Sequence, residues 1–455
     1  MPLRFTASPV VLAALCAIPL FGCSLLVTPD ETALPNENAV DLGRDPIDAG
    51  GLDAGENIDL GVGFDAGNLD ANVLPDIGVP EDMGPCGAAG CIISASNVSD
   101  DLWDHATHDL NVRGGGVTRI NTDTCRLGST DGMIVTQEGG GTVCVIQVNA
   151  LTVADESSLS VRGPIPLIIM ATGRVQIDGE IDASAHGDEP GAGGGAGGTI
   201  DVIDGTGRNP GAAGEHIDEY DDGGGGGGGL CGSGGNGGSG GDASGGDGGD
   251  SESAWTIEPL AGGSGGGRGR GLVDGRDTNA GLGGAGGGAL QISSLTEIIV
   301  NGRIFTGGGG GLGGTRELGD GTNYGSGGGG GSGGALLLEA PAVSFGAAAR
   351  LGLGGGGGGA ASTNTANGGD GNDGAVGPMA SLGGGGMVVG ANGGDGAHGA
   401  TIDGATAVDR PSSTNGAGGG GGSGCMVVRN ASGTLTSSSF VDPTGSVQVL
   451  PMHTR

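Results

Sequence analysis

Residues 175–183 read VQIDGEIDA, residues 298–304 read IIVNGRI, and these two stretches decide the fold. Apolar side chains alternate with polar ones along the first stretch, which is the two-residue period of a strand that buries one face. The second stretch repeats the first with a glycine at the same point, which predicts a turn in each. The equivalent apolar positions are Val175, Ile177 and Ile181 in the first and Ile298, Val300 and Ile304 in the second.

Short apolar segments also precede this point, at residues 143–148, 151–153, 159–161 and 167–170. They recur about every eight residues with turn residues between them, as in all-β proteins. A unit this small cannot bury its own apolar face, whereas stacked copies can. We therefore predict an all-β body, a right-handed parallel β-helix over residues 143–440. An antiparallel β-sandwich fits the same spacing and is the alternative.

Glycine supplies 116 of the 455 residues, and its runs lead directly into apolar segments. This junction predicts a glycine tract followed by a strand at residues 193–203, 286–292, 333–338 and 421–428. Because glycine loses the most backbone entropy on folding, the tracts could be flexible loops. Alternatively, chains without Cβ atoms could pack side by side as extended polyproline-II-like strands. A β-helix also predicts that such insertions leave from one corner of the stack.

The N-terminus has the form of an export signal. Residues 1–22 contain an apolar run too short to span a membrane, and it ends at Leu20-Phe21-Gly22-Cys23. This resembles the bacterial lipoprotein signal, which implies cleavage before Cys23 and lipidation of its thiol. Ser24 then implies delivery to the outer membrane. An ordinary secretory leader with a chance cysteine is the alternative.

Residues 23–85 carry the lipidated cysteine and then an acidic stretch of Asp, Gly and Ala, in which Arg44 is the only basic residue. Its like charges repel and its apolar residues have no period, so we expect a disordered tether. The remaining chain divides into a β-rich segment with local disulfides at residues 86–184 and a glycine-rich β-repeat region at residues 185–455.

Cysteine usage agrees with export. Six cysteines remain in the predicted mature body, and an even number in an oxidising compartment predicts disulfides. Proximity favours two short pairings and leaves one long one. The expected pairs are Cys86–Cys91, Cys125–Cys144 and Cys231–Cys425. The Cys-x4-Cys spacing of the first pair could instead begin a zinc site, but no second ligand pair follows.

The charge balance excludes several classes of function. The formal net charge is −35 and the chain contains no lysine. An acidic chain without basic clusters does not neutralise phosphates, so nucleic acid and anionic lipid surfaces are not expected partners. The absence of lysine excludes Schiff-base and P-loop chemistry.

The apolar segments at residues 143–146, 151–153 and 166–183, together with the Asp-Ala-Gly tether, resemble glycine-rich surface lipoproteins of myxobacteria and similar bacteria. The resemblance covers most of the mature chain and implies its architecture. It implies little about function, because that group is uncharacterised. The likeness to PE-PGRS proteins is one of composition only.

Two motifs suggest ligand sites. Residues 368–376 nearly fit a nonapeptide calcium repeat, which makes Asp370 and Asp373 weak calcium candidates. His105 and His108 lie among carboxylates, but without the spacing of a metalloprotease helix, so a polar loop is favoured. No other cofactor is expected.

We expect a lipid-anchored cell-envelope protein with a structural or adhesive role and no catalysis. Its membrane contact would be the anchor, and a surface glycan or protein ligand stays unknown. One alternative is a polysaccharide-acting β-helix enzyme, for which Arg174 and Arg303 occupy near-equivalent positions. The other is a passive binder of calcium or glycan.

Overall fold

The structure is a computed structural model. It describes residues 94–453 except 129, 138, 219–220, 253–256, 274–275, 317–323, 375–380, 386–390, 410–414 and 436–439. The signal peptide, Cys23, the tether, and the Cys86 and Cys91 pair lie outside the described residues. The described part is nearly all β, and its helical element is the 3-10 helix η2 (Asp100–His105).

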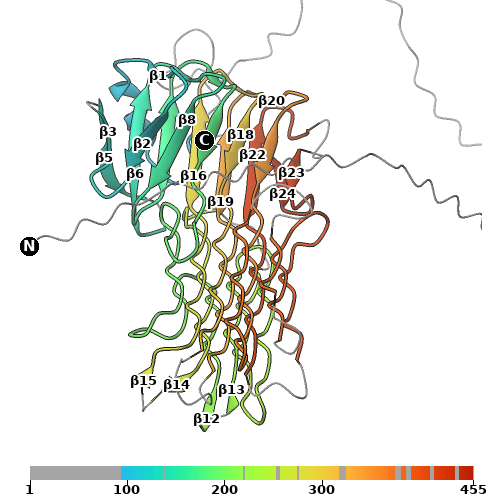
Figure 1. Ribbon diagram of the computed structural model, residues 1–455. Coiled ribbons are helices and arrows are strands. Elements are labelled where there is room, and N and C mark those ends of the chain that lie inside the picture. The colour runs from blue at the N-terminus through green and yellow to red at the C-terminus, as the bar shows by residue number, and fades with distance from the viewer. Residues whose placement is uncertain are drawn as a thin grey trace, which may run out of the picture. The chain divides into compact units, whose positions relative to one another are not determined.

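Three sheets of mostly parallel strands form one end of the described part of the chain (Figure 1). Sheet A has the order β1 (Leu110–Val112), β7 (Leu151–Val153), β10 (Val175–Ile177), β17 (Glu297–Val300) and β20 (Ala342–Phe345). Sheet B has the order β23 (Val441–Asp442), β21 (Arg350–Gly352), β18 (Arg303–Phe305), β11 (Glu180–Asp182), β8 (Ser158–Arg162), β2 (Val117–Asn121), β3 (Arg126–Leu127) and β4 (Thr130–Asp131). Sheet C has the order β24 (Val447–Pro451), β22 (Cys425–Asn430), β19 (Ala335–Glu339), β16 (Ala289–Ser294), β9 (Leu167–Ala171), β6 (Thr142–Val148) and β5 (Met133–Thr136). We call these three sheets together the sheet body.

The chain visits the sheets in a fixed rotation. From β9 it passes to β10 and β11, and it repeats the order C, A, B through β16, β17 and β18 and again through β19, β20 and β21. Like residues stack, since Ile177 pairs with Val300 and Ile181 pairs with Ile304, both in parallel. This confirms the predicted equivalence of the two repeats.

Parallel pairing contradicts the antiparallel alternative for the repeated strands. Within the three sheets, antiparallel pairing joins β2 to β3, β3 to β4 and β5 to β6, all near the start of the described chain. The strands of the three sheets run from Leu110 to Pro451 and so extend beyond residues 143–440 at both ends. The missed early strands β1 and β2 are short and their apolar residues are few.

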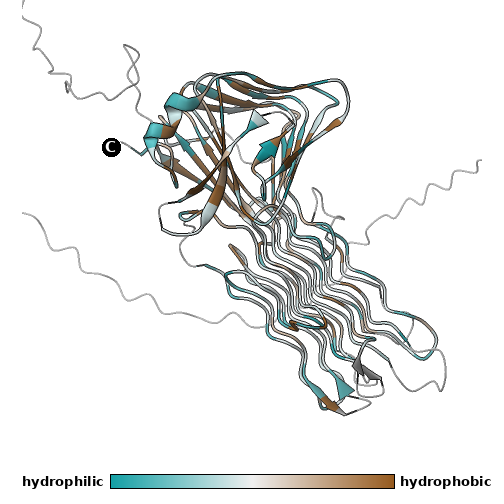
Figure 2. Cartoon of the chain, turned by 90° about the vertical axis from the view of Figure 1, so that its left-hand side faces the viewer, coloured by the Kyte–Doolittle hydropathy of each residue, from teal (hydrophilic) through white to brown (hydrophobic). Residues whose placement is uncertain are grey.

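Two apolar clusters stabilise the sheet body. The first fills the space between the sheets and includes Ile177, Ile181 and Leu167, each with no exposed surface. The second covers the outer face of sheet C, where Trp103 and Leu102 from η2 pack against the strands. The central strands of sheet C, such as β9 and β19, are therefore buried on both faces, which explains their nearly continuous apolar sequence (Figure 2).

The glycine-rich insertions all leave the sheet body at one corner. Each follows a strand of sheet B and returns at a strand of sheet C: β11 to β16, β18 to β19 and β21 to β22. This is the single-corner arrangement that the sequence predicts. We call the described parts of residues 187–288, 306–334 and 353–424 the glycine bundle. It carries two antiparallel hairpins, β12 (His216–Asp218) with β13 (Asp221–Asp222) and β14 (Leu272–Val273) with β15 (Arg276–Asp277).

The glycine tracts of the bundle are ordered and hydrogen-bonded to one another. Successive backbone N–H groups of residues 223–229 donate to three different neighbouring tracts, at residues 209–215, 235–238 and 327–330. Every third N–H group donates to the same tract. Three residues per turn is the period of a polyproline II helix, which has no hydrogen bonds of its own. The tracts therefore satisfy their backbones laterally, and the flexible-loop alternative is wrong for them (Figure 2).

One predicted strand is absent. Residues 199–203 follow a glycine tract but form a bend on the bundle, where Ile200 is 59% and Val202 is 55% exposed. Thr199 and Val202 close the bend with a backbone hydrogen bond of 2.7 Å. The glycine-to-apolar junction does not by itself specify a strand, because here the next residues remain in the bundle.

Candidate functional site

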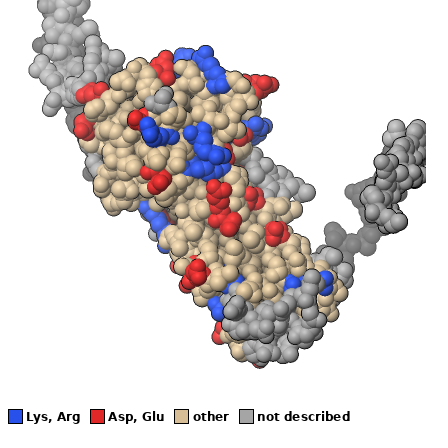
Figure 3. Space-filling view, turned by 60° about the vertical axis from the view of Figure 1, so that its left-hand side comes forward, with Lys and Arg blue, Asp and Glu red and all other residues tan. Residues whose placement is uncertain are grey.

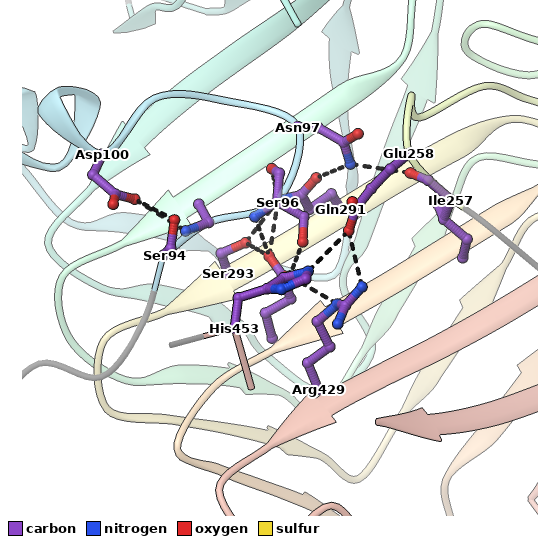
Figure 4. A network of polar contacts seen from close by, with 12 residues as sticks. Ser94, Ser96, Asn97, Asp100, Ile257, Glu258, Gln291, Ser293, Arg429 and His453 are labelled. Carbon is purple, nitrogen blue, oxygen red and sulfur yellow. Dashed lines mark hydrogen bonds and ion pairs between the residues drawn. The ribbon is translucent and has the colours of Figure 1, made fainter. Parts of the chain in front are cut away.

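A buried polar network lies on the outer face of sheet C (Figure 4). Its centre is Glu339 in β19, whose side chain is 1% exposed. This carboxylate accepts hydrogen bonds from the Ser96 hydroxyl at 2.6 Å, the Ser293 hydroxyl at 2.8 Å and the Gln291 amide at 3.0 Å. The Ser96 backbone N–H adds a further bond at 3.1 Å. The network thus ties the segment before η2 to strands β16 and β19.

Asn97 extends this network to a second covering segment. Its backbone has φ +68°, in the left-handed region that asparagine tolerates better than most residues. Its side-chain amide donates to the Ile257 carbonyl at 3.1 Å and to Gln291 at 3.0 Å, and its oxygen accepts from the Leu260 backbone at 3.1 Å. Residues 94–105 and 257–260 are therefore fastened to sheet C together.

Charged groups complete the network at its outer side. Arg429 forms an ion pair with Glu258 at 2.9 Å and lies 3.6 Å from Glu339, while His453 contacts Glu258 at 3.2 Å. Burial raises the pKa of Glu339, although the hydrogen bonds from Ser96 act in the opposite direction. For Glu258, burial is outweighed by hydrogen bonds from His453 and Ser96 together with the charges of Arg429 and His453, and the pKa is lowered. Since Glu339, Gln291 and Arg429 each contact a covering segment, the arrangement favours a fastening role.

A second charged cluster joins the sheet body to the glycine bundle. His186 lies between Asp182 at the end of β11 and Asp373 in the bundle, at 3.4 Å from each carboxylate. Arg162 pairs with Asp182 at 2.6 Å. Hydrogen bonds to Asp182 and Asp373 raise the pKa of His186 to about 9. Burial opposes ionisation of both carboxylates, but their other contacts together outweigh it and lower both pKa values. For Asp182 these contacts are with His186, Arg162 and the Ser184 backbone, and for Asp373 they are with His186 and two backbone N–H groups.

This cluster predicts a pH-dependent contribution to stability. Because the folded pKa of His186 lies above its ordinary 6.5, its contribution is complete below 6.5 and is lost as the pH rises through about 9. His186 is half exposed, so solvent screening limits the effect to about 1 kcal/mol. Urea unfolding should show that wild type loses more stability than His186→Gln between these two pH values. Equal losses would contradict the assignment.

The calcium candidates contact backbone amides. Asp370 accepts from the Gly313 N–H at 2.8 Å, and one Asp373 oxygen accepts from the Gly187 and Gly310 N–H groups at 2.8 Å. No group of three or more His, Cys, Asp or Glu side chains among the described residues is placed to hold a metal. His105 ends η2, and His108 contacts the Thr130 hydroxyl at 3.2 Å.

The arginines considered for polysaccharide chemistry are paired across neighbouring strands. Arg174 contacts Glu297 at 2.6 Å and Arg303 contacts Glu180 at 3.1 Å. Beside the second pair lies an open groove of about 450 Å³ between the edges of sheets A and B, where Asp178 accepts a bond from Asn301 at 2.8 Å. On the face of the molecule drawn in Figure 3, positive and negative side chains are interleaved. The two arginine–glutamate pairs and the Asn301–Asp178 pair thus form a ladder of contacts between neighbouring strands.

A second groove, of about 570 Å³, follows β20 at the end of sheet A. Phe345 and Phe440 are among its lining residues and stack with ring centroids 4.1 Å apart. Sheets B and C continue with β23 and β24, whereas sheet A ends at β20 among the described strands. Among the described residues that line the two grooves, no hydrogen-bonded set of nucleophile, base and oxyanion donor is present.

Two of the predicted disulfides are present, Cys125–Cys144 and Cys231–Cys425. The first fastens the turn between β2 and β3 to β6, and the second fastens the bundle to the start of β22. The long bridge spans 194 residues and so ties an insertion to the strand that follows a later insertion.

The sequence interpretation did not predict that polar side chains at the edge of the glycine bundle accept hydrogen bonds from backbone amides. In residues 232–250 a Gly-Gly-x pattern recurs, with Ser or Asn at x in the first part and Ser or Asp in the second. This three-residue period is the signal of a polyproline II tract with two buried faces, and it was available in the sequence.

Comparison with known protein families, with curated proteins and with solved structures finds no match. No helix among the described residues is both long and apolar enough to cross a bilayer.

Proposed function

We propose that this chain is a lipid-anchored protein of the cell envelope with a structural or adhesive role at the cell surface. The observation that supports it most is the ordered glycine bundle. The bundle projects from the sheet body, and its hairpins β12–β13 and β14–β15 lie at the end remote from the sheets (Figure 1). A rigid projection that carries loops at its far end suits the display of contact surfaces away from an anchor.

We also infer that the sheet body is a right-handed parallel β-helix. The rotation of the chain through sheets C, A and B and the in-register stacking of Ile181 on Ile304 support this fold. Such a stack lets insertions grow without disturbing its rungs. It therefore provides a stable base for the bundle.

The proposal of a lipid anchor is based on the lipoprotein-like signal that ends at Leu20-Phe21-Gly22-Cys23 and on the acidic tether that follows it. Each buried CH2 group of a lipid contributes about 0.8 kcal/mol, and a lipoprotein N-terminus carries several chains. The tether, with like charges along its length, would hold the body away from the headgroups.

Replacing Cys23 with Ser is expected to release the protein from membranes. Fractionation in high salt should find wild type with the outer membrane and Cys23→Ser in the soluble fraction. Protease treatment of intact cells then reports whether the anchored body reaches the surface. A Cys23→Ser protein that still sediments with membranes in high salt would refute the anchor. Cells that adhere equally with anchored and released protein would refute the adhesive role.

A further inference from the structure

Acidic side chains at the rim of the glycine bundle hold backbone amides of the neighbouring tract. Asp403 accepts from the Ser233 backbone N–H at 2.8 Å, and Asp409 accepts from the Ser239 N–H at 2.6 Å. The two carboxylates are six residues apart, which is two turns of a polyproline II helix, and so are the two amides. One tract therefore covers another through a regular row of side chains.

The same contact recurs at other tracts. Asp370 and Asp373 are three residues apart and cover Gly313 and Gly310, also three residues apart. Other carboxylates make single contacts of this kind. The further pairs are Asp395 with Gly383 at 2.8 Å and Asp204 with Ala213 at 2.7 Å. None of these amides donates to a backbone carbonyl of the described residues, so each lies where a further tract would otherwise accept the bond.

Glycine tracts pair with one another through backbone hydrogen bonds, so no particular side chains are needed for pairing. Residues 223–229 run antiparallel to residues 209–215 and parallel to residues 327–330, and they donate to both through the backbone alone. A tract at the rim with free amides would accept another tract in either direction. It would resemble the exposed edge strand of a β-sheet, which pairs with other chains unless it is blocked.

We propose that the rim carboxylates are caps that keep a second copy of this chain from docking on the glycine bundle. The second copy is the partner that fits, because its own rim presents the same backbone groups at the same three-residue spacing. Each cap satisfies an amide and fills the position that the docking tract would take. The rim is thus a docking surface for another copy that is closed in the native protein.

Charge repulsion is the competing explanation, since the chain carries a net charge of −35. The two explanations differ in what asparagine does. Asparagine keeps the oxygen that accepts the amide bond but has no charge, whereas alanine loses both. The paired substitutions at Asp403 and Asp409 therefore separate a cap from a repelling charge.

The experiment measures the mass of the purified protein by light scattering over a wide range of concentration. Wild type and Asp403→Asn/Asp409→Asn should stay monomeric, while Asp403→Ala/Asp409→Ala should reach at least twice the monomer mass as concentration rises. Circular dichroism and an intact Cys231–Cys425 bridge verify that the bundle is folded. A folded alanine variant that stays monomeric overturns the proposal, and an asparagine variant that associates equally shows that charge keeps the copies apart.

Should the double alanine variant unfold, the single variants Asp370→Ala and Asp370→Asn provide the same comparison at another tract. Asp370 covers one amide, that of Gly313, so its removal disturbs the bundle less. Association of Asp370→Ala but not Asp370→Asn supports the cap. A monomeric Asp370→Ala overturns it.

Discussion

Replacing Gly329 with Ala should unfold the glycine bundle. Gly329 lies in the tract at residues 325–334, and its amide donates to the Gly267 carbonyl. A Cβ atom at this position would overlap with the carbonyl oxygen of Gly226 in a neighbouring tract. The obstructing atoms are backbone, so no side chain can rotate to make room. We expect a loss of about 3 kcal/mol or more, at or beyond the upper end of ordinary overpacking.

Gly385 provides the matched control. It also lies in the bundle, but it is exposed and a Cβ atom there would meet nothing within 4 Å. Gly385→Ala should retain stability or gain about 0.4–1 kcal/mol, because alanine restricts the unfolded chain. Urea unfolding of both variants measures the difference. Equal tolerance of the two substitutions would show that the tracts are not closely packed in solution.

The strand repeats could be predicted because their side chains carry the information. The alternation in VQIDGEIDA specifies a buried face, and its match to IIVNGRI specifies which residues stack, as the pairing of Val175 with Ile298 confirms. The glycine bundle has no such pattern at its centre. Its order comes from backbone hydrogen bonds between tracts that are far apart in sequence, and polyglycine gives no sign of which tracts will meet.

The polar network was also beyond sequence reasoning. Ser96 and Glu339 are 243 residues apart, and Asn97 and Ile257 are 160 apart. Serine, asparagine and glutamate are common on surfaces, so their burial is decided by segments 94–105 and 257–260 folding over sheet C. A strand with a glutamate among leucines, as in β19, is the local hint, because a carboxylate in a buried strand requires partners.

Replacing Ile177 with Asp should collapse the sheet body. Ile177 has no exposed surface and lies between Val153 and Val300 in sheet A. A carboxylate there would face the apolar cluster without a donor, and such substitutions cost about 4–5 kcal/mol or more.

Gln176→Asp introduces the same side chain one residue earlier, on the opposite face of the strand. It should cost about 1 kcal/mol, because Gln176 donates to Asp178 at 2.8 Å and that bond would be lost. Thermal unfolding followed by circular dichroism should therefore rank wild type above Gln176→Asp and far above Ile177→Asp. Similar unfolding midpoints for the two variants would mean that the stacked strands do not bury this face. That result would contradict the β-helix that we infer from the stacking.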